Sequence, residues 1–299
     1  MNPDQQAARA NTFLALHRPG EPLLMPNPWD AGSARLLASL GFAALATTSS
    51  GFAATLGRND GSVSRQEALD HAAALAAAVA VPVSADLEDG FGCEPSTVAE
   101  TADEARAAGL AGFSIEDSTG DENAPIHGLR HATERVAAAA QRAHQGDGAR
   151  LVLTARAENH LHGHHDLDDT IARLQAYAAA GADVVFAPGL IAADDIAAVV
   201  AAVGVPVSVL LLPGGPSVGE LAALGVSRIS TGGALAFAAL GAAVEAACEL
   251  RDQGTNRFAT LAATGGRAAR GAFSPGRSWP AGAPLPARWR RCPDSRSDR

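Results

Sequence analysis

Val83-Ser84-Ala85-Asp86-Leu87-Glu88-Asp89-Gly90 is a short apolar run that ends in acidic residues and a glycine. A second run of the same kind, Phe113-Ser114-Ile115-Glu116-Asp117, follows after an alanine-rich stretch of helical length. Short apolar runs that alternate with helical stretches are typical of βαβ units and a parallel sheet. Because parallel sheets bind ligands at the carboxyl ends of their strands, these acidic residues stand where a site is expected.

The same alternation fills residues 22–250 and predicts eight strands, each followed by a helix. Glycine marks the passage from helix to strand, as in Ala107-Ala108-Gly109 and Ala179-Ala180-Gly181. Proline stands at a strand's first residue at Pro82 and Pro206, where it is tolerated. We therefore predict an α/β fold with the architecture of a (β/α)8 TIM-type barrel. A flavodoxin-like sheet is the competing topology, but it uses fewer units.

The expected elements and domains follow from this pattern. The predicted strands cover residues 22–28, 43–49, 82–87, 112–116, 151–155, 182–186, 206–212 and 228–230. The predicted helices cover residues 31–40, 64–79, 95–108, 130–143, 166–179, 192–202, 217–223 and 234–250. Residues 1–255 are expected to form one barrel domain with its C-terminal helix. Residues 256–299, rich in Gly, Pro and Arg, are expected to be a flexible tail or to pack on a neighbouring subunit.

The composition disfavours several classes of protein. The formal net charge of −9 disfavours nucleic acid as a partner, because phosphate binding needs a basic surface. No apolar run is both long and free of polar breaks, so no membrane span is expected, and the first residues lack the layout of a secretory signal. The three cysteines are widely spaced and do not form a disulfide framework. We therefore expect a cytoplasmic protein.

The sequence contains no lysine. Schiff-base aldolase chemistry and pyridoxal phosphate chemistry both need a lysine amine, so both are excluded. Every fixed cationic contact to a substrate must therefore come from arginine or from a protonated histidine.

Three acidic residues are candidate metal ligands. Asp86 and Glu88 lie two apart at a strand end, so both side chains are expected to point the same way, and Glu116 ends the next strand. Three hard oxygen ligands suit Mg2+, with Mn2+ as the alternative, and water and substrate would complete the shell. The competing interpretation is that these acids cap the following helices.

Arg156 ends the fifth predicted strand, next to the predicted metal. Its guanidinium can clamp a carboxylate or phosphonate with two hydrogen bonds. The alternative is a structural ion pair with Glu116, Asp117 or Glu158, and both roles can hold at once. At the end of the second strand, Ser50 and the amides of Gly51 and Phe52 are expected to form an anion-binding nest.

Two other groups are weaker candidates. His160, His162, His164 and His165 form a histidine tract. Without a cysteine or a second spaced histidine pair, we interpret it as a solvated loop that binds metal only adventitiously. Cys93 follows the third strand without an obvious activating base, so we interpret it as a small filler residue.

These residues together resemble the isocitrate lyase and phosphoenolpyruvate mutase superfamily over about residues 10–250. The segments that carry the resemblance are Asn27-Pro28-Trp29-Asp30-Ala31, Thr48-Ser49-Ser50-Gly51, Asp86-Leu87-Glu88-Asp89-Gly90-Phe91-Gly92, Ile115-Glu116-Asp117 and Ala155-Arg156. The resemblance implies a barrel in homodimers or homotetramers that exchange the last helix. It also implies chemistry beside a carbonyl, in which a C–C or C–P bond breaks or forms through an enolate.

By residue matching, the resemblance assigns Asp86, Glu88 and Glu116 to Mg2+ and Arg156 to the developing enolate. Asp60 matches an acidic residue near the metal and the substrate. The substrate's carboxylate or enolate end would be cradled by Ser50, Gly51 and Phe52. Glu88 stands where the family usually has aspartate and remains a competent ligand.

The loop 118–128 departs from the family pattern. Lyase members carry a cysteine there as their general acid, whereas this loop has neither cysteine nor lysine. Mutase members use an asparagine, a part that Asn123 could take. Asn123 and His127 are therefore the polar candidates for catalysis on this loop, which we expect to close as a lid. Pro188 and the run Leu210-Leu211-Leu212 replace polar family residues, so a more apolar pocket is expected.

The sequence thus predicts a Mg2+-dependent lyase that acts on a C–C bond of a small 2-oxo or 2-hydroxy carboxylic acid. A phosphonopyruvate mutase or hydrolase, acting on a C–P bond, is the first alternative. A barrel that binds a metabolite without catalysis is the second. The acidic set argues against the second alternative, because clustered and buried charges are costly to keep.

Overall fold

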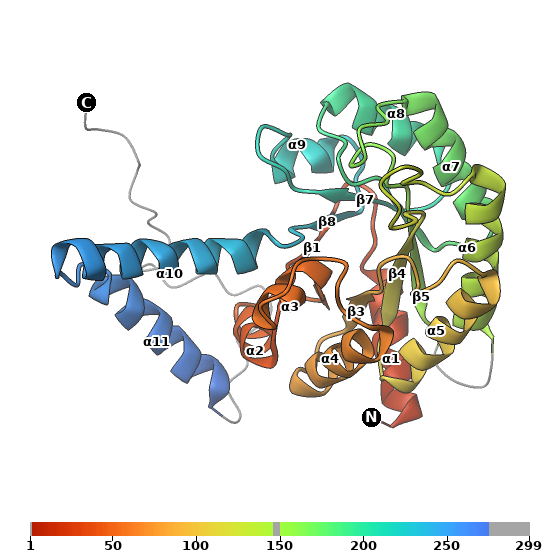
Figure 1. Cartoon of the computed structure of the whole chain (residues 1–299). Helices are drawn as coiled ribbons and strands as arrows, with labels where there is room; N and C mark the ends of the chain where they lie inside the picture. The colour runs from red at the N-terminus through yellow and green to blue at the C-terminus, as the bar shows by residue number, and fades with distance from the viewer. Residues whose placement is uncertain (1, 146–149, 275–299) are drawn as a thin grey trace.

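The computed structural model describes residues 2–145 and 150–274, in which eight parallel strands form a nearly closed barrel (Figure 1). Neighbouring strands follow the order β1-β8-β7-β6-β5-β4-β3-β2. At the seam between the first two strands, Ala46 N donates to Pro26 O at 3.3 Å. The strands are β1 (Leu23–Met25), β2 (Leu45–Ala46), β3 (Val83–Asp86), β4 (Gly112–Glu116), β5 (Val152–Arg156), β6 (Val184–Phe186), β7 (Val207–Leu210) and β8 (Arg228–Ser230). The predicted (β/α)8 architecture is confirmed.

Helices follow the strands and cover the outside of the barrel (Figure 1). They are α1 (Pro3–Ala15), α2 (Ala31–Ser39), α3 (Ser49–Thr55), α4 (Arg65–Ala78), α5 (Pro95–Ala107), α6 (Leu129–His144), α7 (Leu167–Ala179), α8 (Ala193–Ala202), α9 (Val218–Ala223), α10 (Ala234–Gln253) and α11 (Ala259–Phe273). Capping boxes begin three of them: Asp30 with Ser33 at α2, Ser64 with Glu67 at α4, and Ser217 with Glu220 at α9. Each box satisfies amide donors that the first turn would leave unpaired.

Strand register places the acidic residues at one end of the barrel. Asp86 pairs with Ser114 across β3 and β4, and Glu116 pairs with Arg156 across β4 and β5. Because the strands are parallel, these residues all lie at carboxyl ends. The register therefore brings two of the predicted metal ligands, Asp86 and Glu116, and the predicted arginine, Arg156, to the same mouth.

The opposite end of the barrel is closed by α1, a helix that the sequence pattern did not predict. Phe13 of α1 is fully buried. A Cβ atom at Gly112, the first residue of β4, would lie 2.9 Å from Phe13 Cε1 and 2.5 Å from Val152 O. Only glycine leaves room for this approach, so α1 packs directly beneath the sheet.

The last two helices, here called the arm, leave the barrel (Figure 1). Helix α10 extends away from the sheet, and α11 returns to pack against α2. Within α10 only Ala236 is buried, while Phe237 is 51% and Val244 is 61% exposed. The predicted tail is therefore helical over Ala259–Phe273, whereas its remainder, 275–299, lies outside the described residues. No helix in the described ranges is long and apolar enough to cross a membrane.

Candidate active site

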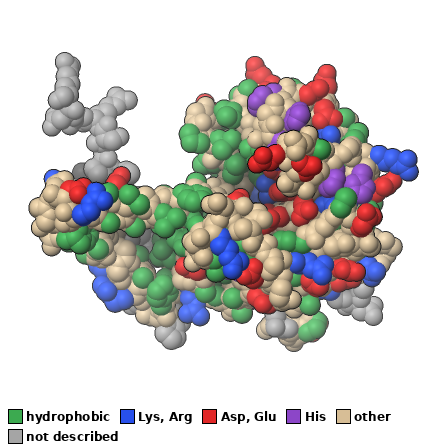
Figure 2. Space-filling model, viewed as in Figure 1, with side chains coloured by type: hydrophobic (Ala, Val, Ile, Leu, Met, Phe, Trp, Pro, Cys, Tyr) green, Lys and Arg blue, Asp and Glu red, His purple; other side chains and the backbone are tan. Residues whose placement is uncertain are grey.

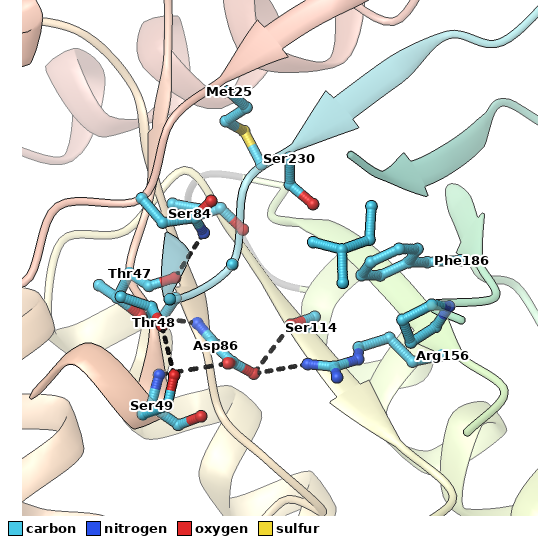
Figure 3. A pocket seen from close by; sticks show the side chains of 18 of the residues that line it. Met25, Thr47, Thr48, Ser49, Ser84, Asp86, Ser114, Arg156, Phe186 and Ser230 are labelled. Atoms are coloured by element: carbon cyan, nitrogen blue, oxygen red, sulfur yellow. Dashed lines mark hydrogen bonds and ion pairs between the residues drawn. The ribbon is translucent and has the colours of Figure 1, made fainter. Parts of the chain in front are cut away.

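Arg156 forms ion pairs with three carboxylates at the barrel mouth, and Figure 3 shows the pair with Asp86. Its Nε donates to Glu158 Oε1 at 2.8 Å, and its Nη1 donates to Asp86 Oδ1 at 3.0 Å. Its Nη2 lies 3.2 Å from Glu116 Oε2. The guanidinium also lies over the Phe186 ring, 5.4 Å from its centroid, a cation–π arrangement. Carboxylates from three successive segments of the barrel therefore fix one cation.

Asp86 is held by the ends of the neighbouring strands (Figure 3). Its backbone N donates to Thr47 Oγ1 at 2.8 Å, and its Oδ2 accepts from Ser49 N at 3.3 Å. Ser114 Oγ lies 3.5 Å from Asp86 Oδ1. These contacts join the second, third and fourth strand ends to the same carboxylate, so its position is set by the sheet rather than by a mobile loop.

The mouth carries more negative charge than Arg156 neutralises. Burial raises the pKa of Glu88 to about 7, with further contributions from Asp86 and Asp60. Burial also raises the pKa of Glu116, which Arg156 opposes and Glu158 reinforces. The same burial would lower the pKa of Arg156, but the surrounding carboxylates hold it well above the usual value. The carboxylate set is thus short of positive charge.

Glu88 reaches the mouth by a route that strand alternation does not describe. The third strand ends at Asp86, and Glu88 has a φ of 48°, in the left-handed region. Asp86 and Glu88 were expected to point the same way because side chains two apart on a strand share a face. That reason was wrong, because Glu88 is not part of the strand. Instead, Glu88 lines a small hollow at the mouth, together with Asp86 and His71.

This donor set fits a hard divalent cation. Asp86, Glu88 and Glu116 offer oxygen ligands. Burial, and then the neighbouring carboxylates, raises the pKa values of Glu88 and Glu116, and a cation beside them would stabilise their charged forms. Mg2+ usually keeps several waters and takes one or two carboxylates, so it does not require all three to converge tightly. These three residues, with Asp60 nearby, are the ones that could hold it.

A cavity of about 140 Å3 lies directly against this cluster. It is lined by the charged side chains of Asp60, Asp86 and Arg156 and by the apolar side chains of Phe186, Pro188 and Leu210. The last two occupy positions at which the sequence predicted a more apolar pocket. The cavity is therefore small, and both charged and apolar side chains line it.

Arg228 of β8 is a cavity residue that the sequence analysis missed. Its Nε donates to Ser208 Oγ at 2.9 Å and its Nη1 donates to Thr154 Oγ1 at 2.9 Å. Burial, followed by the charge of Arg156, lowers the pKa of Arg228 to about 9. Among residues 2–145 and 150–274, no carboxylate forms an ion pair with it. The sequence did contain a signal for this residue, because a charged arginine at position 228 is unusual in a short, otherwise buried strand.

The predicted nest is only partly open to the cavity. Ser50 lines the cavity, and its Oγ lies 3.1 Å from Thr48 Oγ1. The amide of Gly51 donates to Thr48 Oγ1 at 3.3 Å, and that of Phe52 donates to Thr48 O at 3.0 Å. Both amides are thus used in the first turn of α3, and the Phe52 ring stacks on His71 with centroids 3.8 Å apart.

The loop 118–128, the predicted lid, is anchored at both ends. His127 N donates to Asp117 O at 2.8 Å, and Arg173 Nη1 donates to both Asp117 Oδ2 (3.0 Å) and His127 O (2.9 Å). Asn123 is exposed and donates to Asp121. In this conformation neither Asn123 nor His127 lines the cavity. Their predicted part in catalysis remains a prediction that requires the lid to move.

Cys93 does have a base beside it, contrary to the sequence analysis. Its Sγ lies 3.6 Å from His131 Nε2, and the side chain is exposed rather than a filler of the core. The two residues are 38 positions apart, so no local pattern could have paired them. In the histidine tract, the rings of His160 and His165 meet edge to face at 5.4 Å.

Comparison with known proteins gives a consistent picture. The family model described as phosphoenolpyruvate phosphomutase matches residues 13–251. A crystal structure from Burkholderia cenocepacia J2315, provisionally a lyase or mutase, superposes with a TM-score of 0.87 at 54% identity, covering 92% of this chain and 99% of that one. Phosphonopyruvate hydrolase in complex with oxalate and Mg2+ superposes with a TM-score of 0.73 at 25% identity, covering 87% and 91%.

Among proteins compared by sequence, an oxaloacetate decarboxylase of Bradyrhizobium sp. (strain BTAi1) is 32% identical over 219 residues, which cover 70% of this chain and 73% of that protein. The family match spans the barrel from α1 to α10 and includes every residue of the mouth described above. The chain therefore belongs to the phosphoenolpyruvate phosphomutase family, within the isocitrate lyase and phosphoenolpyruvate mutase superfamily.

Proposed function

We propose that this protein is a Mg2+-dependent lyase that cleaves or forms a C–C bond in a small 2-oxo or 2-hydroxy carboxylic acid through an enolate. The observation that carries the proposal is the position of Arg156, which three carboxylates hold against a cavity of about 140 Å3. A cavity of this size suits an acid of few heavy atoms. Mn2+ is the alternative metal.

The free donors of Arg156 point to its role. A guanidinium has five N–H donors. Glu158, Asp86 and Glu116 each occupy one nitrogen of Arg156, which leaves one N–H on each terminal nitrogen for a substrate. Two parallel donors match the two oxygens of an α-oxy acid. Arg156 would thus hold the substrate flat and stabilise negative charge on the enolate oxygen as it develops.

The other residues of the cavity would divide the remaining tasks. Asp86, Glu88 and Glu116 would hold the metal, which would supply a fixed positive charge at the substrate's oxygens. Ser50 would accept or donate a hydrogen bond at the carboxylate end, and buried Arg228 would add positive potential below it. Phe186, Pro188 and Leu210 would exclude water from the apolar side, where the reacting carbon would lie.

The test is turnover with and without Mg2+ on oxaloacetate, isocitrate, 2-methylisocitrate, 2,3-dialkylmalates and phosphonopyruvate. Mg2+-dependent release of pyruvate or glyoxylate from a dicarboxylate or tricarboxylate would support the proposal. Glu116→Ala should abolish that turnover, and Arg156→Lys should lower it at least a hundredfold, because a point charge cannot replace the planar fork. Arg18→Lys, in the exposed pair with Glu21, is the matched control. Unchanged activity of Glu116→Ala would overturn the assignment.

A C–P reaction is the second candidate. The lid lacks the cysteine expected of lyases but contains Asn123, and the similarity to phosphonopyruvate hydrolase extends over 87% of this chain. Phosphorus NMR on phosphonopyruvate distinguishes the two, because phosphate or phosphoenolpyruvate would appear as a new resonance. Mg2+ binding without turnover on any of these acids would favour a metabolite-binding barrel.

We also propose a cytoplasmic homodimer or homotetramer as the working state. The support for an oligomer is the arm, whose apolar side chains Phe237, Leu240 and Val244 are exposed in the single chain. In Figure 2, apolar side chains are visible along the arm and beside the barrel. Contiguous exposed apolar surface of this kind is typical of an interface.

A further inference from the structure

A second group of ligand-type side chains lies outside the carboxylate cluster. Cys93 follows β3, His127 ends the lid, and His131 lies in the first turn of α6. One ligand atom from each lies within 4.8 Å of the others. Within residues 2–145 and 150–274, this is the one trio of His, Cys, Asp or Glu side chains found to converge so closely. None of the three lines the cavity at the barrel mouth.

The spacing of this trio suits a tetrahedral metal ion. Zinc binds cysteine sulfur at about 2.3 Å and histidine nitrogen at about 2.0–2.1 Å, so tetrahedral angles separate the two ligand atoms by about 3.5 Å. The Cys93 Sγ to His131 Nε2 distance is 3.6 Å. Two of the three ligand atoms are therefore already at the separation that a shared ion would impose.

His127 supplies an independent observation. Its Nε2 atom is buried and has no hydrogen-bond partner among the described residues. A buried polar atom without a partner is rare and costly, and coordination to an ion would satisfy it. Burial, then the charges of Arg135 and His131, lowers the pKa of His127. The lid's anchoring to Asp117 and Arg173 holds the backbone of His127 in place.

Hydrogen bonds from Arg135 hold the loop that carries Cys93. Arg135 of α6, whose side chain is among the largest fully buried ones, donates to the carbonyl oxygens of Asp89, Gly92 and Cys93. His131 Nε2 also contacts Cys93 O at 3.0 Å, and binding an ion would replace that bond. The Cys93 carbonyl would still accept from Arg135 Nη1 at 2.7 Å, so no buried acceptor would be left unpaired.

We propose that Cys93, His127 and His131 bind one zinc-type divalent cation, distinct from the hard cation expected at the carboxylates. Sulfur and imidazole ligands select zinc-type ions, whereas carboxylates select Mg2+. Three protein ligands and an exposed cysteine leave the fourth tetrahedral position open to water or a small anion. The ion would tie the loop after β3 to the end of the lid, and so would set the lid's resting position.

The test is binding of Zn2+ and Co2+ to the full chain in excess Mg2+, which keeps the carboxylate site occupied. We expect one equivalent of tightly bound Zn2+, and with Co2+ a sulfur-to-metal charge-transfer band and intense tetrahedral d–d bands. Cys93→Ser and His131→Asn should each weaken Zn2+ binding at least tenfold and remove or shift the band. Cys248→Ser and His162→Asn, which change another free cysteine and a histidine of the tract, should leave both unchanged.

The outcomes separate the alternatives. Absence of the charge-transfer band in the folded wild-type protein would overturn the proposal without any variant. Zn2+ binding that survives Cys93→Ser but is lost in His162→Asn would assign the ion to the histidine tract instead. Because Cys93 is exposed, Cys93→Ser is not expected to affect folding, and circular dichroism checks this.

Discussion

Tyr177 Oη donates a 2.6 Å hydrogen bond to Oδ2 of Asp117, and both side chains are buried. The same oxygen accepts from Arg173 Nη1 at 3.0 Å, while Oδ1 accepts from Glu158 N at 2.8 Å. Asp117 stands at the start of the loop 118–128, and Glu158 is a partner of Arg156. One buried carboxylate therefore links the start of the loop 118–128 to the segment that holds Arg156.

Removing the phenol tests this link. Tyr177→Phe should lower the free energy of unfolding by about 1.5–3 kcal/mol, the usual cost of losing a hydrogen bond to a charged group. Urea unfolding measures the change. Thr133→Val, which removes an exposed hydroxyl bonded to Leu129 O, is the control and should have little effect. Equal stability of Tyr177→Phe and the wild type would show that Arg173 and the Glu158 amide hold Asp117 without the phenol.

The phenol should also resist ionisation. Tyr177 is the only tyrosine of the chain, so its titration can be followed without overlap from others. Burial, then Asp117, raises the pKa of Tyr177 well above its ordinary value of 10.0. In an alkaline titration, tyrosinate absorbance should therefore appear only as the protein unfolds. Absorbance that rises near pH 10 while circular dichroism stays native would contradict the buried contact.

Arg228 should matter for anion binding more than for the fold. Arg228→Met removes the buried cation below the cavity and should weaken the binding of oxalate in the presence of Mg2+ at least tenfold. The thermal midpoint should fall little or rise, because no carboxylate within the described ranges loses a partner. Calorimetric titration measures the oxalate affinity, and a melting curve measures the thermal midpoint. Arg18→Met is the control at an exposed pair, and oxalate affinity equal in both variants would remove Arg228 from the site.

The buried His17 predicts a pH dependence of stability. Burial, then the charge of Arg228, lowers the pKa of His17 from 6.5 to about 3. Between these values the unfolded chain binds more protons than the folded one, so His17 lets stability fall as the pH drops from 6.5 toward 3. Its share of the slope approaches about 1.4 kcal/mol per pH unit. His17→Leu should flatten the slope by that amount, whereas His162→Asn, at an exposed histidine, should not.

The arm should govern the oligomeric state. Leu240→Glu combined with Val244→Glu places two charges on the exposed apolar side of α10. Sedimentation should then show a smaller species than the wild type, because charges in an apolar interface are costly. Ile191→Glu, at an exposed isoleucine outside the arm, should leave the state unchanged. A wild type that sediments as a monomer would contradict the proposed oligomer.

Local sequence patterns were sufficient to predict the eight βα units of the barrel but not the additional helices α3 and α11. The repeat of glycine-ended helices and short apolar strands places all eight βα units, because each is a local choice of period and turn. Helix α11 was missed because its glycines, such as Gly265 and Gly266, read as loop residues. Helix α3 was missed because Ser49-Ser50-Gly51 reads as a turn, although Thr48 caps it.

The candidate site divides in the same way. Asp86, Glu116 and Arg156 follow from strand ends, since parallel strands bring their carboxyl ends together. The left-handed conformation of Glu88 does not follow, because strand alternation stops before it. Nor do Arg228 or the pair Cys93 and His131, whose neighbours are set by packing between distant elements.

Helix α10 leaves its own barrel, so an oligomer formed through α10, as proposed above, would make the cavity at the barrel mouth sensitive to protein concentration. Gly232 and Gly233 line the cavity, and α10 begins at the next residue. A helix that finds its apolar partner on another chain is stabilised by mass action, so each subunit's free energy includes a term that depends on how many copies are present. Dilution is then expected to loosen the start of α10 first, and with it one wall of the cavity. The protein concentration would thus change the shape of the cavity, as an allosteric effector would, although no ligand binds.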